Sequence, residues 1–309
     1  MIAAQETFEG TFPFEPHFST VAGFRMHYVD EGQGDPIICL HGEPTWSYLY
    51  REFIPKLAQT GRVIVPDHMG FGKSETPQDR EYTLQAHVEN LAALVDELGL
   101  DNITFVGQDW GGPIMGAYTV RHPQCVARLC LMNTMLGYGA AVADAPPPAT
   151  KPPKLTSSRW FQWVTKTLDD GTYHDTMNHL GEHVVEIMGK LGLRDVQKKS
   201  AAWKRAYAAP FGSVEECKAA VEFPIDAATG RIGPYVKEGL GGVAALREKP
   251  AMLAEGLADQ AMPPELVMAD FRALFPKGPL VTLDGVGHYC QEDAPEALVA
   301  MIQLFIQMT

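Results

Sequence analysis

Asp109 lies in a sequence frame that enzymes use to present a nucleophile. It is the central residue of Gly107-Gln-Asp-Trp-Gly111, which directly follows the apolar run 103–106. In a G-x-nucleophile-x-G frame the two glycines permit a sharp turn from a strand into a helix, and the turn exposes the central side chain. Serine is the usual nucleophile, but no serine of this sequence lies in that frame. An aspartate carboxylate is ionised at neutral pH, so it can attack a saturated carbon and form an ester without a base.

An ester on Asp109 would need an activated water for its hydrolysis, and His288 is our candidate base. It lies in Asp284-Gly-Val-Gly-His288, just after the β-rich run 280–283. In open α/β sheets, functional sites form beyond the carboxyl ends of the strands. The position of His288 is therefore the one expected for the base.

A third residue, an acid that orients the imidazole and stabilises its charged form, is expected between Asp109 and His288. Asp259 meets this requirement, because it follows the β-rich run 251–254. The rival position, after the run 128–132, holds Asn133, which carries no charge. We therefore predict that Asp109, His288 and Asp259 form a catalytic triad.

The segment His41-Gly-Glu-Pro44 predicts an oxyanion hole. It follows the apolar run 36–40 and occupies the loop that supplies one oxyanion N–H in hydrolases with this nucleophile turn. The residue after the nucleophile supplies the other. We therefore assign the hole to the backbone N–H groups of Glu43 and Trp110.

The elements around these residues predict an α/β fold. The β-rich runs are separated mostly by helical or turn-rich stretches, and their near-continuous apolar composition is typical of a parallel sheet covered on both faces. The run 24–29 alternates instead and predicts a half-exposed antiparallel strand. The expected parallel strands are 36–40, 63–66, 103–106, 128–132, 251–254 and 280–283, and the expected helices include 84–98, 113–121 and 295–307.

The strand–helix rhythm stops between about residues 137 and 230. A proline-rich stretch, 145–153, opens this segment, and the remainder reads as helical. We expect a helical cap domain, 138–229, inserted into a main domain made of 1–137 and 230–309. The predicted fold is thus a mostly parallel, doubly wound sheet with an inserted cap.

Charge and cysteine usage limit the partners of the chain. Its 309 residues carry a formal net charge of −13, which disfavours binding to nucleic acids or anionic membranes. No apolar run is long enough to span a membrane, and the first residues lack the features of a secretory signal. The five cysteines are scattered without a C-x-x-C pair, which favours a reducing cytoplasm over disulfides or a zinc site. Composition leaves open whether the protein is a monomer or a homodimer.

Two further motifs are better explained by ordinary structure. His179-Leu-Gly-Glu-His183 matches a zinc-binding pattern, but an apolar stripe places His179 and Glu182 on the opposite, solvated face of a helix. Gly70-Phe-Gly-Lys-Ser74 misses the phosphate-binding P-loop, because position 67 holds aspartate where that motif needs glycine. We expect neither a metal nor a nucleotide. The stripe consists of Met177, Leu180, Val184, Ile187 and Leu191.

Two segments together resemble the haloalkane dehalogenase family of α/β hydrolases. They are His41-Gly-Glu-Pro-Thr-Trp-Ser-Tyr-Leu-Tyr-Arg51 and Val106-Gly-Gln-Asp-Trp-Gly-Gly112. The chain most resembles the subfamily whose triad acid follows the strand after the cap. The resemblance runs from about residue 24 to the end and is weakest in the cap. It implies that an apolar haloalkane and water give an alcohol, a halide ion and a proton through an aspartyl ester, with no cofactor.

The resemblance also implies that two indole N–H groups bind the halide. One belongs to the residue after the nucleophile, here Trp110. Other dehalogenases have asparagine where this chain has Glu43, and an ionised glutamate cannot donate. We therefore expect the second donor in the cap and choose Trp163, with Trp160 and Trp203 as alternatives.

Epoxide hydrolysis is the alternative function. It uses the same Asp–His–Asp chemistry, with cap tyrosines that donate to the epoxide oxygen. A non-catalytic binding protein of the same fold is a third possibility, although it would not need the complete set of catalytic residues. The candidate tyrosines are Tyr138, Tyr173, Tyr207 and Tyr235.

Overall fold

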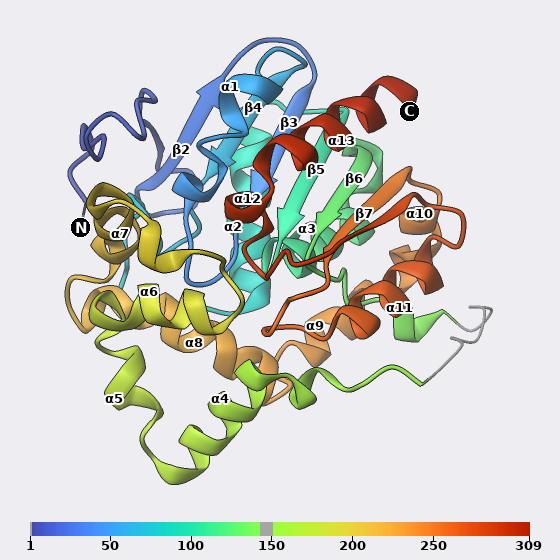
Figure 1. Ribbon diagram of the computed structural model, residues 1–309. Coiled ribbons are helices and arrows are strands. Elements are labelled where there is room, and N and C mark those ends of the chain that lie inside the picture. The colour runs from blue at the N-terminus through green and yellow to red at the C-terminus, as the bar shows by residue number, and fades with distance from the viewer. Residues whose placement is uncertain (1, 143–150) are drawn as a thin grey trace.

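A single eight-stranded sheet forms the centre of the molecule in the computed structural model, which describes residues 2–142 and 151–309 (Figure 1). The strands lie in the order β1-β2-β4-β3-β5-β6-β7-β8. β2 is antiparallel to both of its neighbours, and the strands that follow it in this order, from β4 to β8, are parallel. Their bounds are β1 (His17–Ser19), β2 (Met26–Glu31), β3 (Pro36–Leu40), β4 (Arg62–Pro66), β5 (Ile103–Gln108), β6 (Val126–Met132), β7 (Ala251–Gly256) and β8 (Leu280–Leu283).

All six predicted parallel strands are confirmed, and the fully buried runs β3, β5 and β7 explain their continuous apolar composition. The predicted antiparallel strand is also present as β2. However, its residues 26–29 are buried rather than half exposed. The unpredicted strand β1 pairs with β2, and its rings at His17 and Phe18 pack against Tyr28 and His27.

Helices cover both faces of the sheet. α13 crosses one face, and α2 and α3 pack together on the other (Figure 1). Thr83 begins α2, because its side chain accepts a hydrogen bond from the backbone N–H of Ala86. The helices are α1 (Ile54–Leu57), α2 (Leu84–Glu97), α3 (Gly111–Arg121), α4 (Arg159–Asp170), α5 (Tyr173–Met177), α6 (Leu180–Lys190), α7 (Ala201–Ala208), α8 (Lys218–Ala228), α9 (Gly233–Glu238), α10 (Val243–Arg247), α11 (Pro264–Leu274), α12 (Cys290–Asp293) and α13 (Pro295–Met308).

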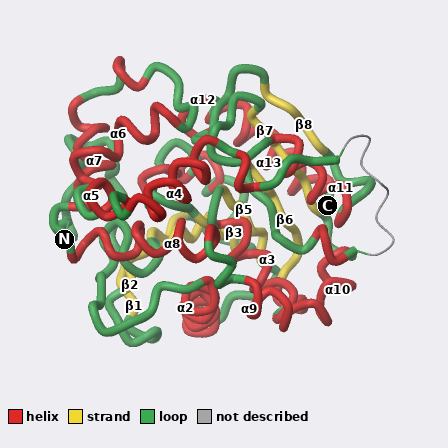
Figure 2. The backbone as a smooth tube through the Cα atoms, turned by 90° about the horizontal axis from the view of Figure 1, so that it is seen from below, coloured by secondary structure: helices red, strands yellow, loops and turns green. Residues whose placement is uncertain are grey.

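The segment predicted as a cap is helical. Residues 151–229 form helices and turns without a strand, and α4–α8 gather at one side of the sheet (Figure 2). Ser158 and Ser200 begin α4 and α7 by accepting hydrogen bonds from the backbone N–H groups of Phe161 and Trp203. The first part of the predicted proline-rich connection, up to residue 150, lies outside the described residues.

Of the two discounted motifs, the first has its polar residues on the surface, whereas Phe71, Lys73 and Ser74 of the second are buried. The apolar stripe around His179 is buried along α5 and α6, while His179 and Glu182 are exposed. Among the described residues, no group of three or more His, Cys, Asp or Glu side chains is arranged to hold a metal ion. No helix in the described part of the chain is long and apolar enough to cross a membrane. All five cysteines are free thiols.

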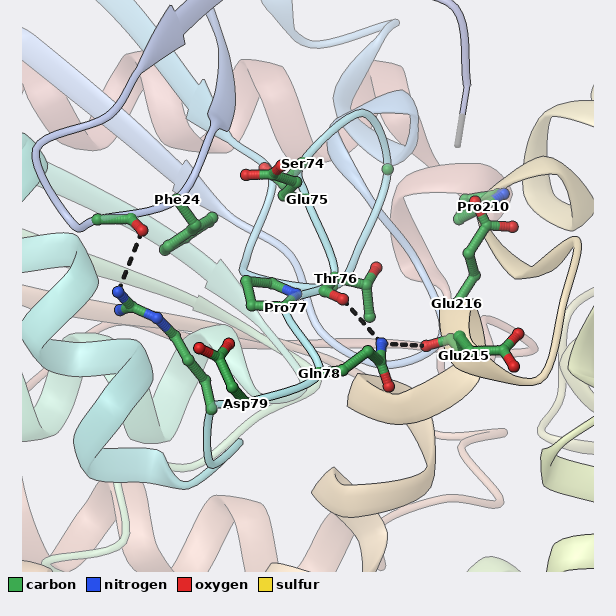
Figure 3. Close-up of a pocket in the computed structure, with 14 residues that line it drawn as sticks. Phe24, Ser74, Glu75, Thr76, Pro77, Gln78, Asp79, Pro210, Glu215 and Glu216 are labelled. Carbon is green, nitrogen blue, oxygen red and sulfur yellow. Dashed lines mark hydrogen bonds between the residues drawn. The ribbon is translucent and has the colours of Figure 1, made fainter.

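Gly70 and Ser74 line a surface pocket of about 420 Å³ (Figure 3). The guanidinium of Arg80, the basic residue of this pocket, donates to the carbonyls of Ala22 and Gly23. The remaining charged groups of the lining are acidic, which opposes the binding of phosphate. These acidic residues are Glu75, Asp79, Glu215 and Glu216.

Candidate active site

Asp109 occupies a strained turn between β5 and α3. Its φ of +52° lies in the left-handed region, which is uncommon for a residue other than glycine. Two close approaches hold the turn. Thr134 Oγ1 donates to the Asp109 carbonyl at 2.5 Å, and a Cβ on Gly42 would lie 2.0 Å from Asp109 Oδ1. Glycine at position 42 is therefore required for the loop after β3 to reach the carboxylate.

The glycines at the start of α3 allow contact with the chain that leaves β6. A Cβ on Gly112 would lie 2.0 Å from Thr134 Oγ1, and one on Gly116 would lie 2.8 Å from the Leu136 carbonyl. The absence of side chains at Gly112 and Gly116 thus lets α3 pack closely against the segment after β6.

The structure brings Asp109, His288 and Asp259 together at the carboxyl ends of β5, β8 and β7. His288 Nε2 lies 3.3 Å from Asp109 Oδ2, and Nδ1 of the same ring lies 2.9 Å from Asp259 Oδ2. The imidazole is almost completely buried between the two carboxylates. One nitrogen therefore faces the candidate nucleophile, while the other is held by the candidate acid.

Asp259 is fixed by hydrogen bonds to both of its oxygens. Oδ1 accepts the backbone N–H groups of Ala261 at 2.7 Å and Met262 at 3.0 Å. Oδ2 accepts the side-chain amide of Asn133 at 2.9 Å. These donors stabilise the ionised carboxylate, because each of them bonds to a lone pair of the charged form.

Asn133 belongs to the site, although its lack of charge argued against it as the triad acid. Its Oδ1 accepts the backbone N–H of Gly256 at 3.0 Å, so its amide links the end of β6 to β7 and to Asp259. The signal in the sequence was its place at the carboxyl end of β6, level with the ends of the other site strands. In the structure, the φ of Asn133 is +43°, in the left-handed region, so its backbone also forms a constrained turn.

Electrostatics in the site favour a charged imidazole. Burial alone would lower the pKa of His288, but the carboxylates of Asp259 and Asp109 raise it to about 10. The charge of Asp109 supports part of this shift. Loss of that charge would therefore lower the pKa of His288.

The backbone N–H of Glu43 donates to Asp109 Oδ1 at 2.8 Å. Two histidines hold the loop that carries it. His41 Nε2 accepts the backbone N–H of His68 at 3.0 Å, and His68 Nε2 lies 2.9 Å from the His41 carbonyl. No motif in the sequence singled out His68, which lies in the loop after β4.

A cavity of about 210 Å³ lies next to the three residues. Its polar side chains are those of Glu43, Asp109, Trp110, Trp160 and His288, and the other described residues of its lining are apolar. Such a lining suits a small apolar molecule with one polar or leaving group. The apolar residues are Leu84, Pro113, Met135, Leu136, Gly137, Leu155, Phe161, Leu191, Ala227, Ile232, Gly233, Val236, Ala261 and Met262.

The tryptophans considered as halide donors differ in where they lie relative to this cavity. Trp110 lines the cavity, and its ring stacks on Phe223 with 4.4 Å between centroids. Trp163 does not line this cavity. It stacks on Trp160, with 5.1 Å between ring centroids, and lines a neighbouring groove of about 490 Å³. Trp160 is thus the cap tryptophan at the cavity, because it and Phe161 lie on the buried side of α4, whereas Trp163 lies at the edge of that side.

The candidate tyrosines also lie away from the cavity, whose described lining contains no tyrosine. The hydroxyl of Tyr173 donates to the Val221 carbonyl, and that of Tyr207 donates to Glu292. The structure therefore offers no tyrosine donor for an epoxide oxygen among the described residues of the lining.

Glu43 lies in surroundings that disfavour the ionised form expected from the sequence. Its side chain is buried, and Oε1 has no hydrogen-bond partner among the described residues. Burial, followed by the charge of Asp109, raises the pKa of Glu43 well above its usual value. Both effects favour the neutral carboxylic acid, which is able to donate a hydrogen bond.

Comparisons with known proteins agree with this geometry. The profile of the alpha/beta hydrolase fold family matches residues 35–295. Haloalkane dehalogenase 2 of Mycobacterium tuberculosis is 34% identical over 294 residues, which cover 94% of each chain. The cis-3-alkyl-4-alkyloxetan-2-one decarboxylase of Shewanella oneidensis is 32% identical over 304 residues, covering 96% of this chain and 90% of that one. A solved loop variant of the haloalkane dehalogenase DbeA from Bradyrhizobium elkanii is 25% identical with a TM-score of 0.72, covering 94% of this chain and 96% of that one.

The sheet order, the inserted helices and the profile match define an α/β hydrolase. The similarity over nearly the full length places the chain more closely. It belongs to the haloalkane dehalogenase family.

Proposed function

We propose that the protein hydrolyses the carbon–halogen bond of small haloalkanes through an ester on Asp109. The observation that carries this proposal is the imidazole of His288 between two carboxylates at the edge of an apolar cavity. An alkyl halide offers no polar group except its leaving group, so this lining matches the substrate class.

In the first step, Asp109 Oδ2 attacks the halogen-bearing carbon. The new C–O bond forms as the carbon–halogen bond breaks, and the halide leaves with the bonding electron pair. The Glu43 backbone N–H on Oδ1 supports the carboxylate here, and Trp110 is the second proposed oxyanion donor. The Trp110 indole is proposed to bind the departing halide, for which a donor-only group is suited.

In the second step, His288 takes a proton from water as the water oxygen attacks the ester carbonyl. The acyl C–O bond then breaks, and the leaving oxygen takes the proton back from the His288 imidazolium to give the alcohol. The carboxylic acid formed on Asp109 loses its proton to solvent, which restores the carboxylate. Esterification removes the charge of Asp109 that helps to raise the pKa of His288. The first step thereby prepares the imidazole to act as a base, and Asp259 stabilises the imidazolium that results.

The helical segment 138–229 is proposed as a cap that closes the cavity over the main domain, 1–137 and 230–309. Trp160 and Phe161 of α4 and Ala227 of α8 contribute to the cavity wall. The remaining partners are water and the halide product, without a cofactor. The free cysteines support the cytoplasm as the proposed location.

The test is a parallel assay of three substrate classes with the purified protein. We expect 1-bromobutane to release bromide and butanol in equal amounts, and Asp109→Ala to release neither. Styrene oxide tests for epoxide hydrolysis through diol formation. A cis-3-alkyl-4-alkyloxetan-2-one tests, through carbon dioxide release, the activity named for the Shewanella relative. Turnover of either alternative substrate without halide release would contradict the proposal.

A further inference from the structure

Gln108 is the residue directly before the candidate nucleophile, and its side chain contacts His288. The amide nitrogen, Nε2, lies 3.1 Å from the carbonyl oxygen of His288 and 3.1 Å from the imidazole Nε2. The side chain is completely buried, and it is not among the residues that line the active-site cavity. Gln108 therefore contacts the proposed base from inside the protein, without facing the substrate.

The contact with the carbonyl fixes which end of the amide faces His288. An amide nitrogen carries two N–H donors, whereas an amide oxygen only accepts. The carbonyl oxygen of His288 also only accepts, so the amide atom beside it must be the nitrogen. One N–H of Gln108 donates to this carbonyl, and the second is left for the imidazole Nε2.

The oxygen of the same amide has no partner. Oε1 of Gln108 is buried without a hydrogen bond among the described residues. A buried amide oxygen that is left unpaired destabilises a fold, so an apolar side chain of the same size would pack there at lower cost. Both polar contacts of Gln108 are on His288, which indicates that the amide acts on the base.

The second N–H distinguishes the two charge states of the imidazole. In the charged ring, the Nε2 proton faces Asp109 Oδ2 at 3.3 Å, and this nitrogen has no lone pair for Gln108. After esterification has removed the charge of Asp109, the Nε2 proton passes to solvent, and the lone pair that remains accepts the amide N–H. A donor at this place stabilises the neutral imidazole, while Nδ1 keeps its proton toward Asp259.

We propose that Gln108 is a positioning residue that holds His288 in the form of a base during the ester intermediate: neutral, protonated on Nδ1 and unprotonated on Nε2. This inference rests on the proposed dehalogenase function. The water that attacks the ester displaces the amide from Nε2 and gives its proton to that nitrogen, while the bond from Gln108 to the His288 carbonyl keeps the base in place. Loss of the amide should therefore slow ester hydrolysis at low pH and leave the first step, in which no base acts, unchanged.

The Asp109→Ala variant tests the contact without turnover, because it lacks the charge that the ester also removes. Nitrogen NMR of isotopically labelled histidine gives the pKa and the tautomer of His288, whose signals are those absent after His288→Phe. In this background we expect Gln108→Met to raise the pKa of His288 by about 0.5 to 1 pH unit, because the neutral imidazole loses one hydrogen bond. Gln291→Met is the matched control, at a buried glutamine whose amide oxygen accepts from Cys290, and we expect it to leave this pKa unchanged.

The other titratable groups around His288 are the same in Asp109→Ala and in Asp109→Ala/Gln108→Met. A difference in the pKa of His288 between these two proteins therefore belongs to Gln108. The groups are Asp259, which contacts Nδ1, Tyr289, whose ring centroid lies 5.0 Å from that of the imidazole, and the carboxyl groups of Glu43 and Glu255.

Single-turnover kinetics with 1-bromobutane test the same step in the protein with Asp109 intact. Gln108→Met should release the first halide at the rate of the unmodified protein. The pH at which ester hydrolysis falls to half of its maximum should rise by about 0.5 to 1 pH unit, which makes hydrolysis roughly 3- to 10-fold slower on the acidic side. A uniform loss at every pH would instead indicate a purely structural role and would overturn the inference.

An unchanged or lowered pKa of His288 in Gln108→Met, or an equal rise in Gln291→Met, would also overturn the inference. A second measurement serves if Gln108→Met does not fold, as circular dichroism will show. In Asp109→Ala alone, one amide proton of Gln108 should move downfield as His288 loses its proton, and a resonance that stays fixed would overturn the inference. Absence of halide release from every haloalkane removes the proposed function, whereas the NMR titration still decides whether Gln108 acts on His288.

Discussion

The side-chain amide of Asn133 donates to Asp259 Oδ2, the same oxygen that contacts His288 Nδ1. Adjacent parallel strands, β6 and β7, therefore end in an amide and a carboxylate that hold each other, and only the carboxylate carries charge. This pair of residues decides which strand end would supply the proposed triad acid.

Exchange of the Asn133 and Asp259 side chains tests how the position of the negative charge relative to the imidazole affects ester hydrolysis. Asp259→Asn removes the charge that stabilises the imidazolium, and we expect ester hydrolysis to slow by about four orders of magnitude. The double variant Asn133→Asp/Asp259→Asn returns one negative charge to the pair, and we expect it to regain part of the lost rate. Single-turnover measurement of alcohol release checks both. A normal rate in Asp259→Asn would show that the acid lies elsewhere.

His288→Phe should separate the two chemical steps. The carboxylate attacks carbon without a base, whereas water attack on the ester needs one. We expect about one halide released per active site, followed by arrest with the alkyl group on Asp109. Intact-protein mass and peptide mapping measure the adduct. Sustained turnover, or an alkyl group on another residue, would rule out this mechanism.

Trp160 separates the active-site cavity from the neighbouring groove. Trp160 and Leu191 line both spaces, whereas Trp163 lines only the groove. We expect Trp160→Ala to join the two and to favour longer haloalkanes, by roughly fourfold in kcat/KM for each methylene that reaches the new apolar surface. Trp163→Ala is the matched control, and we expect it to keep the chain-length preference of the unmodified protein. Equal shifts in both variants would mean that the groove, rather than this partition, selects the substrate.

Glu292 should make stability depend on pH. Burial would raise its pKa, but Arg51, Lys199 and Tyr207 lower it from 4.5 to about 2. The folded pKa lies below the unfolded one, so the stabilisation is complete above the unfolded pKa and disappears as pH falls toward about 2. It corresponds to about 3 kcal/mol. Urea unfolding across this range should show the decline.

Glu292→Gln should remove most of that decline and lower the free energy of unfolding at neutral pH by about 3 kcal/mol. In this variant the hydroxyl of Tyr207 on α7 also no longer has a charged carboxylate on α12 as its hydrogen-bond acceptor. Glu296→Gln, at an exposed glutamate on α13, is the control and should change stability by less than about 0.5 kcal/mol. Similar losses of unfolding free energy in the two variants would show that the burial of Glu292 does not cause the effect on stability.

Local patterns predicted the parts of the molecule that depend on short segments. The glycines around Asp109 predict the turn, since only glycine fits where the loop at Gly42 and the start of α3 approach so closely. The apolar runs predict the parallel strands, because a strand covered on both faces needs apolar residues throughout. Parallel strands end at one edge of a sheet, so the sequence alone was enough to expect Asp109, Asp259 and His288 near one another.

Tertiary structure decided everything that depends on packing between distant segments. The short strand β1 has no pattern of its own and exists because it pairs with β2. Trp163 and Trp160 have the same side chain on the same helix, and only the packing of α4 determines which one lines the cavity. The raised pKa of the Glu43 carboxyl group follows from its burial beside Asp109, 66 residues away in the chain. The sequence specifies which groups are present, but the free energy of a charge depends on its surroundings, and these form only when the chain has folded.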